Sequence, residues 1–277
     1  MKLFARKKNE KATNRFEHLL RADDIPSFPS VVAEAIEKVA RPDVDLGDVA
    51  STISADPKIT LAVLKLANSP AFAPRTPITS VPQAVVLLGR NQLESLLIAS
   101  GVAEVIPSQA TTGYSPHAFW STAALRAAVA AEMASLVAPS TEYEQFTAAL
   151  LQDMAQPILF HHDPTYADLV VASCDSHHEL ARREREVLGW THPEIGGMLC
   201  ENWGLPEQLT ASVSAHHDET IEGFEIAQWA ALIEGPDTDM ELLIAEATRR
   251  FGVDEDTVLQ VFERAAERAA DIAGAFH

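Results

Sequence analysis

The fold is decided by a stretch in the first third of the chain, SADPKITLAVLKLANSP at residues 54–70. Asp56 stands directly before Pro57. This pair predicts a helix start, because aspartate accepts hydrogen bonds from the first free amides and proline tolerates the first helical position. From Ile59 to Ala67 the side chains are apolar on almost every face of such a helix. This distribution predicts a central, buried helix, which the sequence Asn-Ser-Pro at 68–70 ends.

Apolar residues recur with helical spacing through most of the chain on either side of this stretch. Gly89 is expected to end one helix in a left-handed conformation, and the spacing from Thr141 to Glu144 predicts a capping box at the start of another. Only the run 169–172 is ambiguous between helix and strand. Further helices are predicted at residues 31–39, 46–53, 81–88, 93–102, 119–137, 142–158, 166–174, 179–188, 193–203, 206–215, 224–233, 240–251 and 254–275. The sequence therefore predicts an all-α fold.

Composition excludes several classes of protein. The 277 residues include 40 acidic and 21 basic side chains, a formal net charge of −19, and such a surface repels nucleic acid. No apolar run approaches the ~18 residues that a membrane span needs, so no transmembrane segment is expected. Cys174 and Cys200 are the two cysteines, too few for a disulfide framework or a thiolate zinc site. These features favour a cytoplasmic protein without a nucleic-acid partner.

Charge also divides the chain. Residues 1–22 hold seven basic and two acidic residues, a net of +5, so the remainder carries −24. We expect 1–22 to be a flexible basic arm and not a secretory signal, because no long apolar stretch follows it. Residues 219–277 are expected to form an acidic helical extension that packs on the core. The alternative, pairing with a second copy of the chain, stays open.

Ten histidines are the main chemical signal, and they gather in the second half of the chain. The tripeptide His-His-Asp occurs at 161–163 and again at 216–218, with further histidines at 177, 178 and 192. Imidazole and carboxylate groups are suitable ligands for a divalent metal if three or four converge. Histidines at helix ends also interact favourably with the last carbonyls. For the pair at 216–217 both interpretations stay open.

Three motifs resemble the HDOD domain, a bacterial relative of the HD phosphohydrolases. They are Ile25-Pro26-Ser27-Phe28-Pro29, the run from Ile53 to Ser69, and Ile78 to Gly89. The resemblance covers residues 23–218 and implies an HD-like helical domain with subdomains at about 23–106 and 117–218, followed by additional C-terminal helices.

The resemblance also implies a metal centre built from a histidine on an early helix, a His-Asp pair on a later helix, and a further aspartate. Thr122 and Gln152 stand where the histidines are expected, which leaves Asp153. Neutral oxygens are weak ligands compared with imidazole, so a metal-bound hydroxide is disfavoured. We expect no catalytic residue, no metal and no cofactor. The candidates for a vestigial pocket are Thr122, Gln152, Asp153, His192, His216 and His217.

These observations predict a non-catalytic bacterial signal-transduction module. It would act through contacts with signalling proteins and sense a small ligand in the vestigial pocket. Two alternatives stay open. One is a metal-dependent phosphohydrolase or phosphodiesterase with a shifted ligand set, in which Asp153 combines with His161, His162, His192 or His216. The other is a nucleotide sensor without hydrolysis.

Overall fold

A computed structural model describes residues 26–69, 72, 74–162, 164–171, 177–218 and 220–276. These residues form helices and connecting loops without a β-strand, which confirms the all-α prediction. The ambiguous run is helical as far as it is described, to Val171. The predicted basic arm and Cys174 lie outside the described residues. Within the described part of the chain, no helix has the length and hydropathy needed to cross a membrane.

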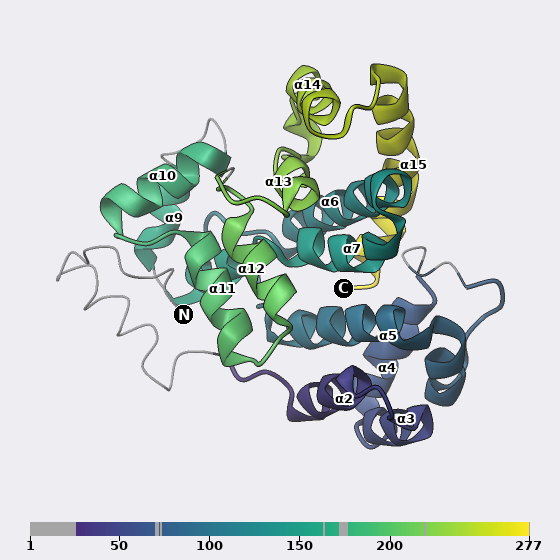
Figure 1. Ribbon diagram of the computed structural model, residues 1–277. Helices are drawn as coiled ribbons and strands as arrows, with labels where there is room; N and C mark the ends of the chain where they lie inside the picture. Colours follow the sequence, from purple (N-terminus) through teal and green to yellow (C-terminus); the bar gives the residue numbers. More distant parts are fainter. Residues whose placement is uncertain are drawn as a thin grey trace.

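The N-terminal half consists of three short helices packed against a long one (Figure 1). These are α2 (Ser30–Ala40), α3 (Leu46–Ser54), α4 (Pro57–Ala67) and the long α5 (Val81–Val105). Asp56 caps α4 as predicted, and Gly89, with φ of +68°, breaks the helical path of α5. The predicted all-round burial of α4 is wrong, because Leu61 is 69% exposed. The helix packs on α5 and α3 and leaves its opposite face to solvent.

The second half contains the elements that build the polar centre. They are α6 (Pro116–Val137), α7 (Glu142–Leu151), α8 (Ala155–His162), α9 (Pro164–Val171), α10 (His177–Val187), α11 (His192–Asn202) and α12 (Glu207–Ala215). The helix predicted at 142–158 is two helices, because the chain turns at 152–154. The predicted capping box is also wrong. The Thr141 hydroxyl donates to the Ala138 carbonyl at 2.9 Å and closes the short 3₁₀ helix Pro139–Thr141 instead.

The C-terminal helices pack on α6, on α7 and on one another, as the sequence favoured (Figure 1). They are α13 (Glu225–Ala230), the 3₁₀ helix Gly235–Asp237, α14 (Met240–Phe251) and α15 (Glu255–Gly274). Arg264 and Arg268 of α15 both pair with Glu132 of α6, at 3.0 and 2.6 Å. The ring of Phe276 stacks on Trp120 with centroids 4.2 Å apart. The domain limits at 23, 218 and 219 stay predictions.

The proline-containing segment 26–29 contacts both halves of the fold. Phe28 stacks on Trp203 with ring centroids 5.4 Å apart, and the Trp203 indole donates to the Pro26 carbonyl at 3.0 Å. Gly101 of α5 leaves the space that the Phe28 ring fills, since a Cβ there would lie 2.3 Å from the ring. The apolar core consequently runs without a break from α2 to α15.

Candidate functional site

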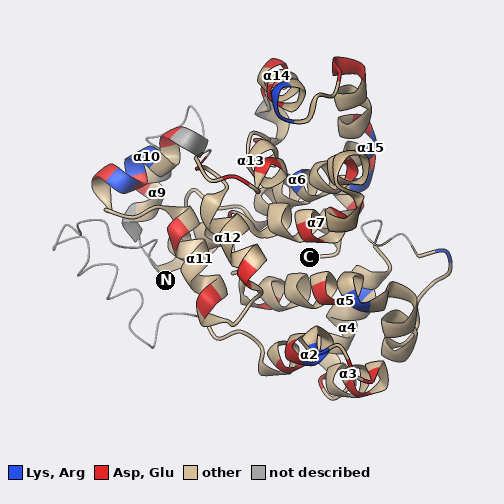
Figure 2. Cartoon of the chain, in the orientation of Figure 1, with Lys and Arg blue, Asp and Glu red and all other residues tan. Residues whose placement is uncertain are grey.

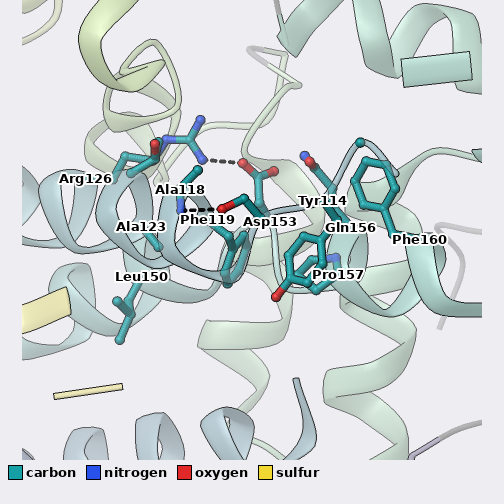
Figure 3. Close-up of a pocket in the computed structure, with 13 residues that line it drawn as sticks. Tyr114, Ala118, Phe119, Ala123, Arg126, Leu150, Asp153, Gln156, Pro157 and Phe160 are labelled. Atoms are coloured by element: carbon teal, nitrogen blue, oxygen red, sulfur yellow. Dashed lines mark hydrogen bonds and ion pairs between the residues drawn. The ribbon is translucent and has the colours of Figure 1, made fainter. Parts of the chain in front are cut away.

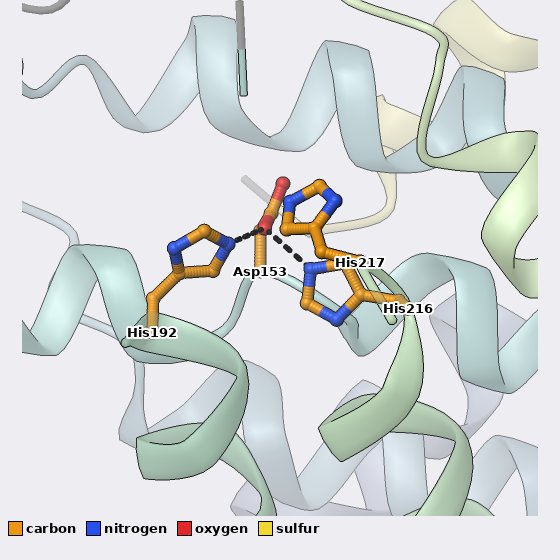
Figure 4. A group of neighbouring side chains, drawn as sticks. All are labelled: Asp153, His192, His216 and His217. Atoms are coloured by element: carbon orange, nitrogen blue, oxygen red, sulfur yellow. Dashed lines mark ion pairs between the residues drawn. The ribbon is translucent and has the colours of Figure 1, made fainter. Parts of the chain in front are cut away.

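Asp153 lies in the turn between α7 and α8, and its carboxylate is the centre of a buried polar cluster (Figure 4). The side chain is 5% exposed. The carboxylate is thus carried by the turn that interrupts the predicted helix 142–158. Its two oxygens face different partners, which gives the site two sides.

The Oδ2 side of Asp153 faces a guanidinium (Figure 3). Arg126 projects from α6, is 2% exposed and forms an ion pair with Oδ2 through Nη1. Its Nε donates to the carbonyl of Ile233 at 2.7 Å. Buried charges are tolerated when they are paired and hydrogen-bonded in this way. The arginine therefore supplies a fixed positive charge next to the carboxylate.

The Oδ1 side of Asp153 faces imidazoles (Figure 4). His192 begins α11 and places Nε2 3.1 Å from Oδ1, while His216 follows α12 and places Nε2 3.3 Å from the same oxygen. His217 completes the group, and its ring centroid lies 4.2 Å from that of His216. One donor atom from each of these four residues falls within 4.8 Å of every other.

A second set of hydrogen bonds orients the two buried imidazoles. Nδ1 of His192 lies 2.8 Å from Oε2 of Glu184, which also accepts the His192 backbone amide at 2.8 Å. Tyr166 donates its hydroxyl to the other oxygen of Glu184 at 2.6 Å. Nδ1 of His216 lies 2.6 Å from the carbonyl of Val213. Both rings therefore present Nε2 to Asp153.

Burial and neighbouring charges shift the pKa values in opposite directions. Burial favours the neutral acid, yet the Arg126 guanidinium and the two histidines hold the pKa of Asp153 well below its usual range. Burial also favours neutral imidazole, but the carboxylates of Glu184 and Asp153 raise the pKa of His192 to about 9. For His216 burial prevails and lowers the pKa. The pKa values of the two imidazoles that face this one carboxylate are thus shifted in opposite directions.

The structure brings four of the six predicted pocket residues together, namely Asp153, His192, His216 and His217. Thr122 lies instead on the Arg126 side, where both line a cavity of about 190 Å³ (Figure 3). Gln152 is buried, and its amide makes no hydrogen bond to the described residues. Of the alternative ligands, His161 and His162 are exposed at the end of α8 and do not belong to the cluster.

Sequence reasoning missed three residues of the centre. Arg126 carried a usable signal, because it is the one charge within an alanine-rich run from 122 to 131. Glu184 carried none, since it lies among charged residues that suggest a solvated helix face. Tyr166 resembled an ordinary core residue. Only the fold shows that Glu184 and Tyr166 are both buried behind His192.

The donor set fits a metal ion on the Oδ1 side. Three imidazoles and one carboxylate are ligands that zinc and other divalent transition metals accept. Metal-binding histidines usually donate their second ring N–H to a carboxylate or a backbone carbonyl, as Glu184 and Val213 allow here. On the Oδ2 side the Arg126 guanidinium already neutralises the carboxylate. The residues present thus suit one ion.

The helical fold and the buried His-Asp centre define an HD-like domain. The family model of the HDOD domain matches residues 25–219, about 70% of the chain. The chain belongs to the HDOD family, as the sequence motifs predicted.

One curated protein is similar to this chain in sequence. A protein of Treponema pallidum (strain Nichols), described only as uncharacterized, is 28% identical over an alignment of 213 positions that covers 72% of this chain. The chain spans 38% of the length of that curated relative.

Two solved structures resemble the full helical arrangement. One, from Shewanella amazonensis SB2B, has a name that proposes a phosphohydrolase. It is 23% identical, with a TM-score of 0.75 over 94% of this chain and 97% of its own. The other, from Marinobacter aquaeolei VT8, has a name that proposes a role in signal transduction. It is 22% identical, with a TM-score of 0.70 over 96% of this chain and 64% of its own. At these identities the likeness shows the fold alone.

Proposed function

We propose that the protein is a non-catalytic signal-transduction module that acts through protein contacts. The observation that carries this proposal is the buried ion pair between Arg126 and Asp153. Family membership and the fold shared with a protein named for signal transduction support a regulatory role.

The ion pair argues against hydrolysis on electrostatic grounds. A hydrolytic metal centre holds a water molecule in an open position and lowers its pKa toward neutrality. Arg126 already pairs with Oδ2 of Asp153, and its positive charge disfavours a water-activating cation at this oxygen. Thr122 and Gln152, at the positions expected for histidine, offer only neutral oxygens.

The first test is an assay for hydrolysis. Untagged protein loaded with Mn²⁺, Fe²⁺ or Zn²⁺ is incubated with p-nitrophenyl phosphate and with its bis ester. We expect release of p-nitrophenol no faster than in buffer with the same metal. Turnover that disappears in Asp153→Asn would refute the non-catalytic proposal.

That outcome would favour a second candidate, a metal-dependent phosphohydrolase with a shifted ligand set. The observation in its favour is the cluster of three imidazoles around Oδ1 of Asp153. Of the ligands considered from the sequence, Asp153, His192 and His216 fit this candidate, and His161 and His162 do not.

Partner contacts are proposed to use the exposed apolar side chains of the N-terminal half. Leu61 on α4 and Val86 and Leu87 on α5 are 69%, 74% and 55% exposed, on two helices that pack together. Over the chain as a whole acidic side chains outnumber lysines and arginines, 40 to 21, and Figure 2 shows them on most helices. Such a surface steers basic partners and raises association rates more than affinity.

Capture from extracts of the native host tests this surface. Wild-type protein is compared with Val86→Asp, and Val187→Asp on α10 serves as the matched control, because Val187 is also exposed. We expect Val86→Asp to lose a partner that wild type and the control retain. Equal capture by all three would contradict a contact through α5.

A small-ligand input is proposed for the cavity between α6 and α8. Tyr114, Phe119 and Phe160 form its apolar wall, and Arg126 and Asp153 form its polar end (Figure 3). A ligand there would touch the charged pair directly. Screening nucleotides and small aromatic compounds by thermal shift tests this input, because a ligand of the native state raises the midpoint with concentration. No shift in wild type, or an equal shift in Ala123→Leu, whose larger side chain would enter the cavity, would contradict it.

A further inference from the structure

We infer that the cavity between α6 and α8 binds a neutral, planar molecule with one aromatic ring and a carbonyl oxygen that accepts a hydrogen bond. An aromatic amide is the simplest member of this class. The inference rests on the small-ligand input proposed above and names the chemical class of the ligand. The cavity supports it through its size, its aromatic wall, the neutral charge of its polar end and one buried amide group.

The size of the cavity suits a single ring. Its volume is about 190 Å³, whereas about 150 Å³ is enough to bind benzene. The additional space accommodates a small substituent such as an amide. A nucleoside phosphate would have to leave its sugar and phosphates outside, beside Ser115 and Ala118, the exposed residues of the lining. The volume therefore favours a one-ring ligand over a nucleotide.

Three aromatic side chains form a wall that is held in place by its own contacts (Figure 3). The ring centroid of Tyr114 lies 5.9 Å from that of Phe160 and 6.3 Å from that of Phe119. The Tyr114 hydroxyl donates to the Pro107 carbonyl at 2.8 Å, and its backbone pairs with that of Thr111. Because these contacts fix the ring, binding costs little ordering of the wall. Aromatic groups prefer offset or edge-on aromatic partners, which favours a planar ring in the cavity.

The polar end of the cavity is neutral. Arg126 and Asp153 both line it and compensate each other's charge in a buried ion pair. Tyr114 is the remaining titratable group among the described lining residues, and burial raises its pKa to about 12, so it is uncharged near neutral pH. An ionised ligand would bury an additional charge beside a pair that is already balanced, which is costly. The cavity therefore favours a neutral ligand.

One donor in the lining lacks a hydrogen-bond partner among the described residues. It is Nε2 of Gln156, in the first turn of α8, and it is buried. Buried amide groups of native proteins are nearly always hydrogen-bonded. A carbonyl oxygen accepts a hydrogen bond from this nitrogen without bringing a charge into the cavity. The unpaired amide thus supplies the reason for an acceptor on the ligand.

Three small compounds separate these features. Benzamide has the ring and a neutral acceptor, benzoate replaces the amide by a charged carboxylate, and toluene has the ring without an acceptor. Their binding to the full untagged chain is measured by calorimetry and by the thermal midpoint. We expect benzamide to raise the midpoint with concentration. Benzoate should bind at least about tenfold more weakly, because its charge is buried without a counter-charge.

Gln156→Leu tests the acceptor, since leucine removes the donor and keeps a similar volume. Loss of one hydrogen bond should weaken benzamide binding about 5–10-fold, whereas toluene should bind as tightly as to wild type or more tightly. A merely structural disturbance would weaken both compounds together. The ratio of the two dissociation constants therefore reports on the contact between Gln156 and the ligand.

Matched controls separate the cavity from the rest of the chain. Gln145→Leu replaces another partly buried glutamine, on α7 and outside the cavity, and should bind benzamide like wild type. Ala123→Leu places a larger side chain in the cavity and should bind none of the three compounds. The midpoint of each variant without added compound shows whether it folds as wild type does.

Failure of the ligand class and failure of the small-ligand input give different results. The inference is overturned, and the input stands, if benzoate binds as tightly as benzamide or if a folded Gln156→Leu variant keeps the wild-type affinity for benzamide. It is also overturned if benzamide does not bind. In that case the input stands only if another compound of the wider panel binds to wild type and not to Ala123→Leu.

Discussion

Replacing Arg126 by methionine tests the role of the buried ion pair. Methionine keeps much of the side-chain volume but removes the charge that faces Asp153 and the donor to the Ile233 carbonyl. Arg126 is 2% exposed, so water cannot compensate for either loss. Removing one partner of a buried pair costs about 3–5 kcal/mol, since the carboxylate of Asp153 stays buried and keeps only the imidazoles of His192 and His216 as partners.

The expected change in melting temperature follows from chain length. The entropy of unfolding is about 2.1 cal/mol/K per residue, which gives roughly 0.6 kcal/mol/K for 277 residues. A loss of 3–5 kcal/mol then lowers the melting temperature by about 5–9 °C. The double variant Arg126→Met/Asp153→Asn should be more stable than the single variant, because it no longer buries a carboxylate that has lost its guanidinium.

Calorimetry and urea unfolding in the presence of chelator measure these effects without interference from metal. Arg41→Met is the matched control, because Arg41 is 59% exposed and pairs with Glu37 on the surface. Such a pair is worth about 1 kcal/mol or less. The reasoning would be refuted if Arg126→Met cost no more than this control, or if the double variant were as unstable as Arg126→Met.

Three further predictions concern stability. Tyr166→Phe removes a hydrogen bond to the buried carboxylate of Glu184. The free energy of unfolding in urea should fall by about 1.5–3 kcal/mol, and an unchanged free energy would contradict this. Gly101→Ala places a Cβ 2.3 Å from the ring of Phe28. We expect the variant to be less stable, because overpacking costs about 1–3 kcal/mol of unfolding free energy and the better helix former returns about 1 kcal/mol. A stabilised variant would contradict this. His192 has its pKa raised to about 9 in the folded protein, above an unfolded value near 6.5. The contribution of protonated His192 to stability is therefore complete below about pH 6.5 and disappears as pH rises toward 9. Melting curves in chelator from pH 6 to 9.5 should show this loss of stability for wild type and not for His192→Gln.

Local signals were sufficient for most of the helices. Asp56 before Pro57 determines where α4 begins, and the hydrogen bonds from Lys58 and Ile59 amides to Asp56 confirm it. Gly89 was placed correctly because only glycine adopts a φ of +68° without strain. Helix ends of this kind depend on a few neighbouring residues, which the sequence displays directly.

Prediction from neighbouring residues failed where tertiary packing determines the structure. The turn at 152–154 was missed although Pro157, in the first turn of α8, signals a break within the predicted helix 142–158; how sharply the chain turns before that proline depends on tertiary contacts. The exposure of Leu61 likewise depends on which elements lie beside α4, and hydropathy cannot tell this. Competition between tertiary contacts and helix propensity is settled by the whole fold.

For the site, the sequence by itself determined which functional groups are present. It contains Asp153 and the histidines, and it has no histidine at positions 122 and 152. Only the tertiary structure decided the pairing, with Arg126 on one oxygen of Asp153 and the imidazoles on the other. The physical reason is distance along the chain. Arg126 and Asp153 are 27 residues apart, and contact between them depends on how α6 packs against α7. Charges that attract across such a separation leave no periodic pattern in the sequence.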